Sequence, residues 1–155
     1  MLYLDSSALA KRYFQEKGTL AVSARFDGGE RIYTSVLSYG EIHAAMGRKL
    51  RSNETDAEEL ERRRDAFTND WVFALSKVEL SVHTMSALPK LVEVYDLKAG
   101  DAIHLSAALW LRDTIRLRTK STYAKEAFEF GVADRRLGWV AAQCGLQVFD
   151  PENEH

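Results

Sequence analysis

The sequence has a single cysteine, Cys144, among its 155 residues, which excludes an internal disulfide. It has no apolar run long enough for a membrane span and no signal-peptide pattern at its start, so we expect a cytoplasmic location and no membrane partner. No internal repeat or low-complexity segment interrupts it. The formal net charge of -2 gives no overall attraction to nucleic acid, so phosphate contacts would need local basic patches or bound cations.

The remaining composition is that of a globular protein, with 46% hydrophobic residues and a length sufficient for one core. Strand-like runs alternate with helix-like stretches, which predicts a three-layer α/β/α domain around a central, mostly parallel sheet of about five strands. We assign residues 1–150 to this single domain and residues 151–155 to a frayed polar tail. The pattern predicts strands near 2–4, 31–35, 77–80, 129–133 and 146–149, and helices near 7–17, 19–26, 37–50, 55–75, 84–96, 101–112 and 135–143.

Two of these helices have distinctive sequences. The helix over 55–75 opens with Thr55 and Glu58, which match a capping box. Its ERRR run at residues 61–64 is typical of a solvated face. The helix over 101–112, DAIHLSAALWLR, is apolar almost all round and should be buried.

Four acidic residues fall at or near the starts of predicted helices. Asp5 follows the first strand, Glu41 lies in the first turn of the helix after the second strand, Asp101 opens the apolar helix, and Asp134 follows the strand at 129–133. In a parallel sheet such junctions line the crevice at the carboxyl ends of the strands, where ligands bind. The four carboxylates are therefore candidates for one site.

Helix capping is the alternative for each acid taken singly. Asp5, Asp101 and Asp134 have the chemistry of N-caps, and Ser38 with Glu41 matches a capping box. If the four converge, unit charges about 4 Å apart repel by about 4 kcal/mol near a protein surface, so protons or a cation must offset them. Oxygen ligands without a His or Cys cluster favour Mg²⁺ or Mn²⁺. Such a site suits metal-assisted phosphodiester hydrolysis.

Four segments, YLDSSAL, SYGEIHAA, GDAIHLSAAL and VADRRLGWVAAQCGLQVF, occur in this order and span nearly the whole chain. Together they resemble the PIN domain, and specifically the toxins of VapBC-type toxin–antitoxin modules. GDAIHLSAAL is the most specific of them, whereas the segment with Glu41 would carry little weight alone.

The resemblance implies a Mg²⁺- or Mn²⁺-dependent endoribonuclease. It implies that Asp5, Glu41, Asp101 and Asp134 bind the metal and are catalytic, and that the Ser6 hydroxyl helps to organise the site. It also implies a homodimer and a cognate VapB-like antitoxin whose C-terminal segment wraps the toxin. Because water would be the nucleophile, RNA cleavage should leave a 5′-phosphate and a 3′-hydroxyl.

The chain departs from this pattern in two places. Val132 occupies a position, two residues before Asp134, where the family often has Thr or Ser. An insertion at about 113–128 stands where relatives have a short connection. Its basic residues Arg116, Arg118 and Lys120 are candidates for RNA binding, because cations with interleaved aromatic side chains suit single strands. A helical extension that packs on the dimer mate or the antitoxin, and a solvated excursion, are the alternatives.

Other conspicuous side chains have structural explanations. We expect His104 to be a hydrogen-bonded structural histidine, His43 to lie at the surface, and Cys144 to pack as a small apolar residue. Trp71, Trp110 and Trp139 fit core or interface packing.

Two functions besides the nuclease stay open at this point. One is a PIN fold kept as a catalytically degenerate binding module, which Val132 leaves possible. The other is a receiver-like phosphoacceptor domain, which also places acids at strand ends. It fits less well, because the adjacent acidic pair and the lysine that receivers use are missing.

Overall fold

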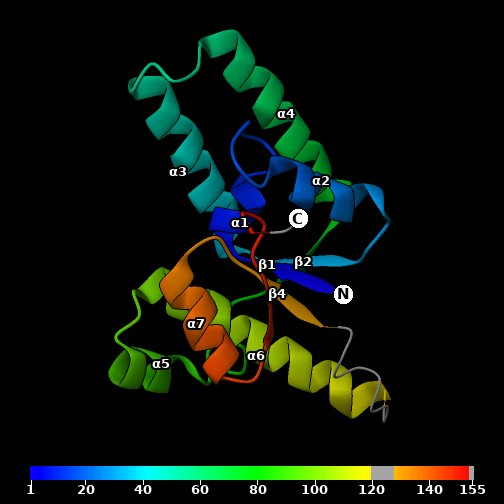
Figure 1. Cartoon of the computed structure of the whole chain (residues 1–155), viewed down its shortest axis with the longest axis vertical. Coiled ribbons are helices and arrows are strands. Elements are labelled where there is room, and N and C mark those ends of the chain that lie inside the picture. The colour runs from blue at the N-terminus through cyan, green and yellow to red at the C-terminus, as the bar shows by residue number, and fades with distance from the viewer. Residues whose placement is uncertain (120–127, 154–155) are drawn as a thin grey trace.

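The computed structural model describes residues 1–119 and 128–153 (Figure 1). In these residues twelve elements follow one another, with strands and helices largely alternating. In chain order they are β1 (Leu2–Leu4), α1 (Ser6–Ala10), α2 (Thr19–Asp27), β2 (Ile32–Ser35), α3 (Leu37–Arg51), α4 (Ala57–Phe73), β3 (Leu75–Val78), α5 (Leu88–Tyr95), α6 (Ala99–Thr119), β4 (Glu129–Gly131), α7 (Arg135–Gln143) and β5 (Gln147–Phe149).

The described strands form one five-stranded sheet in the order β3-β2-β1-β4-β5, and every neighbouring pair is parallel. The first strand of the chain is therefore the central one. Its three residues are fully buried, as expected for a parallel strand covered on both faces. The predicted α/β class and the central parallel sheet are confirmed.

Two separate apolar clusters cover the two faces of the sheet. Alternate side chains of β1 point to opposite faces, so Tyr3 joins one cluster while Leu2 and Leu4 join the other. Buried residues of α5, α6 and α7 complete the first cluster, and residues of α1 to α4 complete the second. Figure 1 shows the same division, with α1–α4 on one side of the strands and α5–α7 on the other.

The strand order places a crevice at the carboxyl end of β1. The chain leaves β1 toward β2 on one side, and its later part returns to pair β4 on the other side. Such a reversal is a topological switch point, where the loops diverge and leave room for a ligand. Asp5 lies directly at this point, because it is the first residue after β1.

The region after the apolar helix differs from the prediction. We expected the helix to end at Arg112 and an insertion to follow, but α6 continues unbroken through Thr119. The first part of the 113–128 insertion is therefore a helical extension. Arg116 and Arg118 lie on this extension, whereas Lys120 lies outside the described residues. Phe128, just before β4, is buried in the core.

Helix boundaries differ at two other places. The first helix ends at Ala10 instead of about Lys17, and turns lead from there to Gly18, whose φ of 92° suits glycine. The cap of α4 is Asp56 and not Thr55: the Asp56 carboxylate accepts a 2.7 Å bond from the Glu59 amide. Aspartate and threonine are both good caps, so their adjacency hid the boundary from the sequence pattern.

Three surface expectations also change. Pro151 is buried and Glu152 accepts a 2.6 Å bond from Lys11, so this part of the expected tail is docked, whereas residues 154–155 lie outside the described range. His43 is half-buried, with its ring 5.4 Å from that of Phe67. Trp139 is 60% exposed, which excludes the core for it and leaves interface packing as a prediction.

Candidate functional site

Asp5 is a buried carboxylate that ends β1 and caps α1. Its Oδ1 accepts a 2.8 Å bond from the Ala8 amide, and the Ser7 hydroxyl donates to both of its oxygens at 2.9 and 2.8 Å. The Asp5 amide donates to the Gly131 carbonyl at 3.0 Å, which fixes this turn to β4. Burial raises the pKa of Asp5 although His104 and these hydrogen bonds act in the opposite direction. The fold therefore places the Asp5 carboxyl group where burial disfavours its charged form.

Glu41 is held by two side chains from other elements. The Ser6 hydroxyl donates to its Oε2, and Nε2 of His104 lies 2.9 Å from the same oxygen. Half-burial raises the pKa of Glu41, but the hydrogen bonds from His104 and Ser6 outweigh it and leave the pKa below its ordinary value. Glu41 therefore remains ionised while Asp5 resists ionisation.

Glu41 does not form the capping box that Ser38 suggested. The helix α3 begins at Leu37 without a side-chain cap, and the Ser38 hydroxyl instead lies 3.0 Å from that of Ser6 and 2.6 Å from that of Thr34. The Thr34 hydroxyl donates to the Leu4 carbonyl at 2.8 Å. A line of hydroxyl groups thus connects Glu41 to the end of β1.

His104 is 2% exposed and joins this network from α6. Its Nδ1 lies 3.2 Å from the Tyr3 hydroxyl, and its Nε2 lies within hydrogen-bonding distance of both Ser6 and Glu41. One tautomer satisfies the whole arrangement, with Nδ1 accepting from Tyr3 and Nε2–H donating to Glu41. The prediction of a satisfied structural histidine is confirmed, and its partner is a residue of the candidate site.

Asp101 lies in the first turn of α6, where the helix approaches α3 closely. A Cβ added at Gly100 would lie 3.1 Å from Oε1 of Glu41, so glycine permits this approach. Burial raises the pKa of Asp101, and the charge of Asp134 raises it further. Asp134 itself is exposed and caps α7 by accepting a 2.8 Å bond from the Leu137 amide.

Three of the four acids line one cavity of about 330 Å³ at the carboxyl end of β1. Its lining includes Asp5, Ser6, Glu41, Asp101 and His104. Asp101 also lines a second cavity of about 240 Å³, together with Asp134, Lys98 and Arg136. The structure therefore brings Asp5, Glu41 and Asp101 together and places Asp134 in the adjoining cavity on the far side of Asp101. We call the first of these the acid cavity.

The acids of this cavity form an open set of oxygen donors. Among residues 1–119 and 128–153, no three His, Cys, Asp or Glu side chains are grouped so that they could hold a metal ion as they stand. Instead, Glu41 and Asp5 are hydrogen-bonded to protein groups. Mg²⁺ retains several waters and is held by one or two carboxylates, so an open carboxylate set fits it better than it fits an ion that needs a full protein cage.

Sequence reasoning missed several polar residues around the acids. Tyr3, Ser7 and Arg48 were not singled out, and Ser38 was expected only as a helix cap, although each contacts an acid or its partners or lines the acid cavity. Tyr3 is disguised as a core aromatic within a strand, and only its hydroxyl reaches His104. For Arg48, the signal was present in the seven-residue spacing from Glu41, which puts both on one face of a helix.

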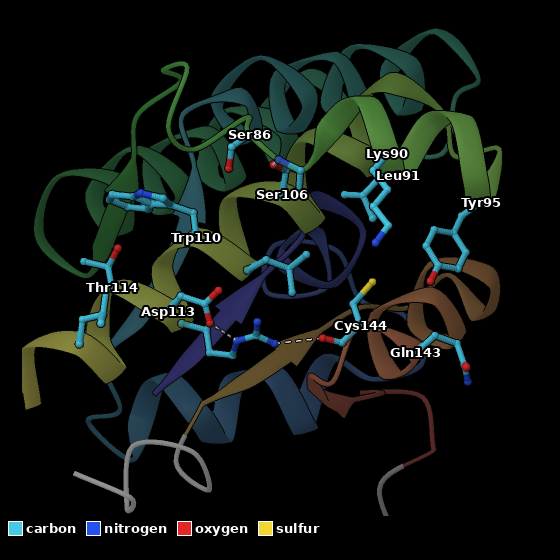
Figure 2. Close-up of a pocket in the computed structure, with 14 residues that line it drawn as sticks. Ser86, Lys90, Leu91, Tyr95, Ser106, Trp110, Asp113, Thr114, Gln143 and Cys144 are labelled. Carbon is cyan, nitrogen blue, oxygen red and sulfur yellow. Dashed lines mark hydrogen bonds and ion pairs between the residues drawn. The ribbon is translucent and has the colours of Figure 1, made fainter. Parts of the chain in front are cut away.

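A cavity of about 510 Å³, larger than the acid cavity, lies between α5, α6 and α7. Figure 2 shows Lys90, Tyr95 and Trp110 around it, with Cys144 at one side. Arg112 is engaged there by Asp113 at 2.8 Å and by the Cys144 carbonyl at 3.1 Å. Burial raises the pKa of the Cys144 thiol, which makes it a poor nucleophile. None of the four acids lines this cavity.

The candidate RNA-binding residues Arg116 and Arg118 lie near the C-terminal end of α6, far from the acid at its start. Arg116 is fifteen residues beyond Asp101, which corresponds to about 22 Å along a helix. Arg116 is 3.6 Å from Asp113, and Arg118 is exposed. RNA binding by Arg116 and Arg118 stays a prediction, but it would occur at a distance from Asp101.

The sequence-family model of the PIN domain matches residues 2–117 of this chain. Two curated proteins of Mycobacterium tuberculosis, Ribonuclease VapC45 (strain CDC 1551 / Oshkosh) and Ribonuclease VapC49 (strain ATCC 25618 / H37Rv), are each 32% identical over 149 residues, covering 96% of this chain and 94% of theirs.

Solved structures share the fold at low sequence identity. FitAcB from Neisseria gonorrhoeae has a TM-score of 0.63 at 12% identity and covers 99% of this chain and 100% of that chain. VapBC2 from Rickettsia felis, bound to a DNA fragment from its promoter, has a TM-score of 0.59 at 13% identity, with 97% and 98% covered. These similarities confirm the three-layer fold.

Proposed function

This chain belongs to the PIN domain family, among its VapC-type ribonucleases, and on that premise we propose that it is a Mg²⁺- or Mn²⁺-dependent endoribonuclease. The observation that carries the proposal is the acid cavity, in which Asp5, Glu41 and Asp101 meet at the switch point of the sheet. Capping explains Asp5 and Asp134 in part, but it does not explain why Glu41 and Asp101 face the same cavity as Asp5.

We assign metal binding to Asp5, Glu41, Asp101 and Asp134. The raised pKa values of Asp5 and Asp101 support this assignment, because a cation would offset the burial and mutual repulsion that raise them. When bound, Mg²⁺ would polarise an RNA phosphate and lower the pKa of a coordinated water.

The remaining polar side chains orient the acids. Ser6 and His104 hold Oε2 of Glu41, which leaves Oε1 without a hydrogen bond among the described residues and directs it toward Gly100 at the start of α6. Ser7 and the Ala8 amide fix the carboxylate of Asp5 in the same way. These contacts restrict each acid to one rotamer, which preorganises the site. Val132 is buried, and its amide donates to the Phe149 carbonyl. Because a valine side chain has no oxygen, it cannot orient Asp134 through a hydrogen bond.

The comparisons also support an interacting partner. VapC-type ribonucleases belong to VapBC pairs, and we propose that this chain binds a cognate VapB-like antitoxin, forms a homodimer and acts in the cytoplasm. In the described part of the chain, no helix combines the length and apolarity that crossing a membrane requires.

A catalytically degenerate binding module is the second candidate function, and the missing hydroxyl at Val132 favours it. It predicts neither saturable Mn²⁺ binding nor cleavage. Membership of the PIN domain family argues against the receiver-like phosphoacceptor.

The test is cleavage of a single-stranded RNA by the purified protein in Mg²⁺, analysed by mass spectrometry of the product ends. Asp101→Asn should reduce cleavage by at least 100-fold, because it removes a carboxylate from the centre of the site. Asp113→Asn is the matched control on the same helix, since Asp113 is exposed and lines neither acid-bearing cavity. Equal activity of the wild type in Mg²⁺ and in EDTA would contradict the proposal.

A further inference from the structure

Arg48 lies on the wall of the acid cavity, and its side chain has no partner among the residues that the structure describes. It follows Glu41 by seven residues on α3, so the two side chains project from the same face of the helix. Its charge is one of the influences that lower the pKa of Glu41. Among the described residues, no hydrogen bond or ion pair engages its side chain, which is exposed. Its neighbour Lys49, by contrast, is paired with Glu54 at 3.0 Å.

Lys98 is a second cation close to Asp101. It lies just before α6 and lines the second cavity with Asp101 and Asp134. Its charge acts on Asp101 in the direction that lowers the pKa. The Lys98 side chain is exposed and also has no described partner, whereas Arg136 in the same cavity donates to the Tyr95 carbonyl at 2.9 Å.

The two cations therefore line the two cavities that share Asp101, and each acts on a different acid, Arg48 on Glu41 and Lys98 on Asp101. A stabilising role alone would pair each with its nearest carboxylate, yet Glu41 is bonded to Ser6 and His104 instead. Phosphate groups that approach a cluster of carboxylates are repelled, so a nucleic-acid strand needs cations beside the acids as well as a bound metal. Arginine and lysine without other partners supply such contacts.

We propose that Arg48 and Lys98 bind the RNA phosphates on either side of the one that is cleaved, so that the strand crosses Asp101 from α3 toward the start of α6. This inference rests on the proposed nuclease function and adds a direction to it. One part of the RNA strand lies over the acid cavity beside Arg48, and the other part lies over the second cavity beside Lys98.

The experiment measures affinity for a fluorescent single-stranded RNA in the inactive Asp101→Asn background, as a function of salt. Arg48→Gln and Lys98→Gln should each weaken binding by about tenfold, because each removes a charge-assisted hydrogen bond. Each should also lower the magnitude of the slope of log K against log salt by about 0.7, the value for one contact to a single strand. The double variant should show the sum of both effects.

Arg51→Gln and Lys90→Gln are the matched controls. Arg51 lies one turn beyond Arg48 on α3, and Lys90 lines the separate 510 Å³ cavity, so both remove an equal charge without touching either acid-bearing cavity. A second readout excludes damage to the fold: in the otherwise wild-type protein, Arg48→Gln should leave Mn²⁺ affinity unchanged or tighten it, since it removes a competing cation near Glu41.

Unchanged affinity and slope in the double variant would overturn the inference. An effect of only one of the two substitutions would overturn the path across Asp101, and equal effects of the controls would reduce both residues to general surface charge. These outcomes are separate from failure of the nuclease proposal, which is decided by cleavage of RNA by the wild type in Mg²⁺.

Discussion

Replacing Asp5 by asparagine should stabilise the metal-free protein at neutral pH while it abolishes cleavage. The Asp5 carboxylate is 5% exposed, and its raised pKa means that burial disfavours the charge by more than its hydrogen bonds return. Asparagine caps helices about as well as aspartate, so the bond from Ala8 is kept, whereas the charge and one of the two oxygens that accept from Ser7 are lost. We expect a gain on the order of 1 kcal/mol, since a buried ion costs several kcal/mol before its hydrogen bonds offset part of this.

For a chain of this length, 1 kcal/mol corresponds to a Tm increase of about 2–4 °C. Asp5→Ala separates the two contributions, because it removes both the charge and the cap and should be about 0.5–2 kcal/mol less stable than Asp5→Asn. Thermal unfolding followed by circular dichroism in EDTA at pH 7.5 measures all three proteins.

The pH dependence of stability gives the sign of the Asp5 contribution. With its pKa raised, the folded state binds the Asp5 proton more tightly than the unfolded chain does, so wild-type stability falls as the pH rises from about 3.9, the ordinary pKa, through the raised folded value. The advantage of Asp5→Asn should therefore be larger at pH 7.5 than at pH 4. An Asp5→Asn protein less stable than the wild type at pH 7.5, or a difference that does not change with pH, would refute this reasoning.

Three further substitutions test other parts of the structure. Tyr3→Phe removes the hydroxyl that lies 3.2 Å from Nδ1 of His104 and should lower the free energy of unfolding by about 1 kcal/mol and reduce cleavage, both measurable on one sample; unchanged values would mean that the bond does not orient His104. Gly131→Ala would place a methyl group against Leu4 and 3.0 Å from Phe149, so urea unfolding should show a loss of about 1–3 kcal/mol, and a neutral effect would mean that the centre of the sheet is loosely packed. Asp56→Ala should cost about 1 kcal/mol and Thr55→Ala little, and the reverse order in thermal unfolding would restore Thr55 as the cap of α4.

The sequence predicts the architecture because its signals are local and repeated. The strands are short segments that contain apolar residues, and the helices have apolar residues at helical spacing, so the alternation alone indicates a parallel sheet. The end of α6 escapes this reasoning, since Asp113 to Thr119 carry charges that suit a loop as well as an exposed helix. The early end of α1 has a tertiary cause: Lys11 turns inward and donates to the Lys17 carbonyl and Glu152.

The acids of the candidate site are predictable from the sequence, whereas the residues that support them, apart from Ser6, are not. Strand ends identify Asp5 and Asp134, and helix starts identify Glu41 and Asp101, from position alone. The contact between Ser6 and His104 joins residues 98 positions apart, so only the folded chain reveals it. The same holds for the place of Arg48 beside the acid cavity, because a basic residue in the last turn of a helix is ordinary until its surroundings are known.

The most direct test of the account is calorimetric titration of Mn²⁺ into the wild type, Asp101→Asn and the Asp113→Asn control. We predict saturable binding by the wild type and the control and its loss in Asp101→Asn, with a stabilisation of about 2.7 kcal/mol when free Mn²⁺ reaches one hundred times its Kd. The absence of saturable binding by the wild type, or equal binding by Asp101→Asn, would contradict a metal centre built on these acids.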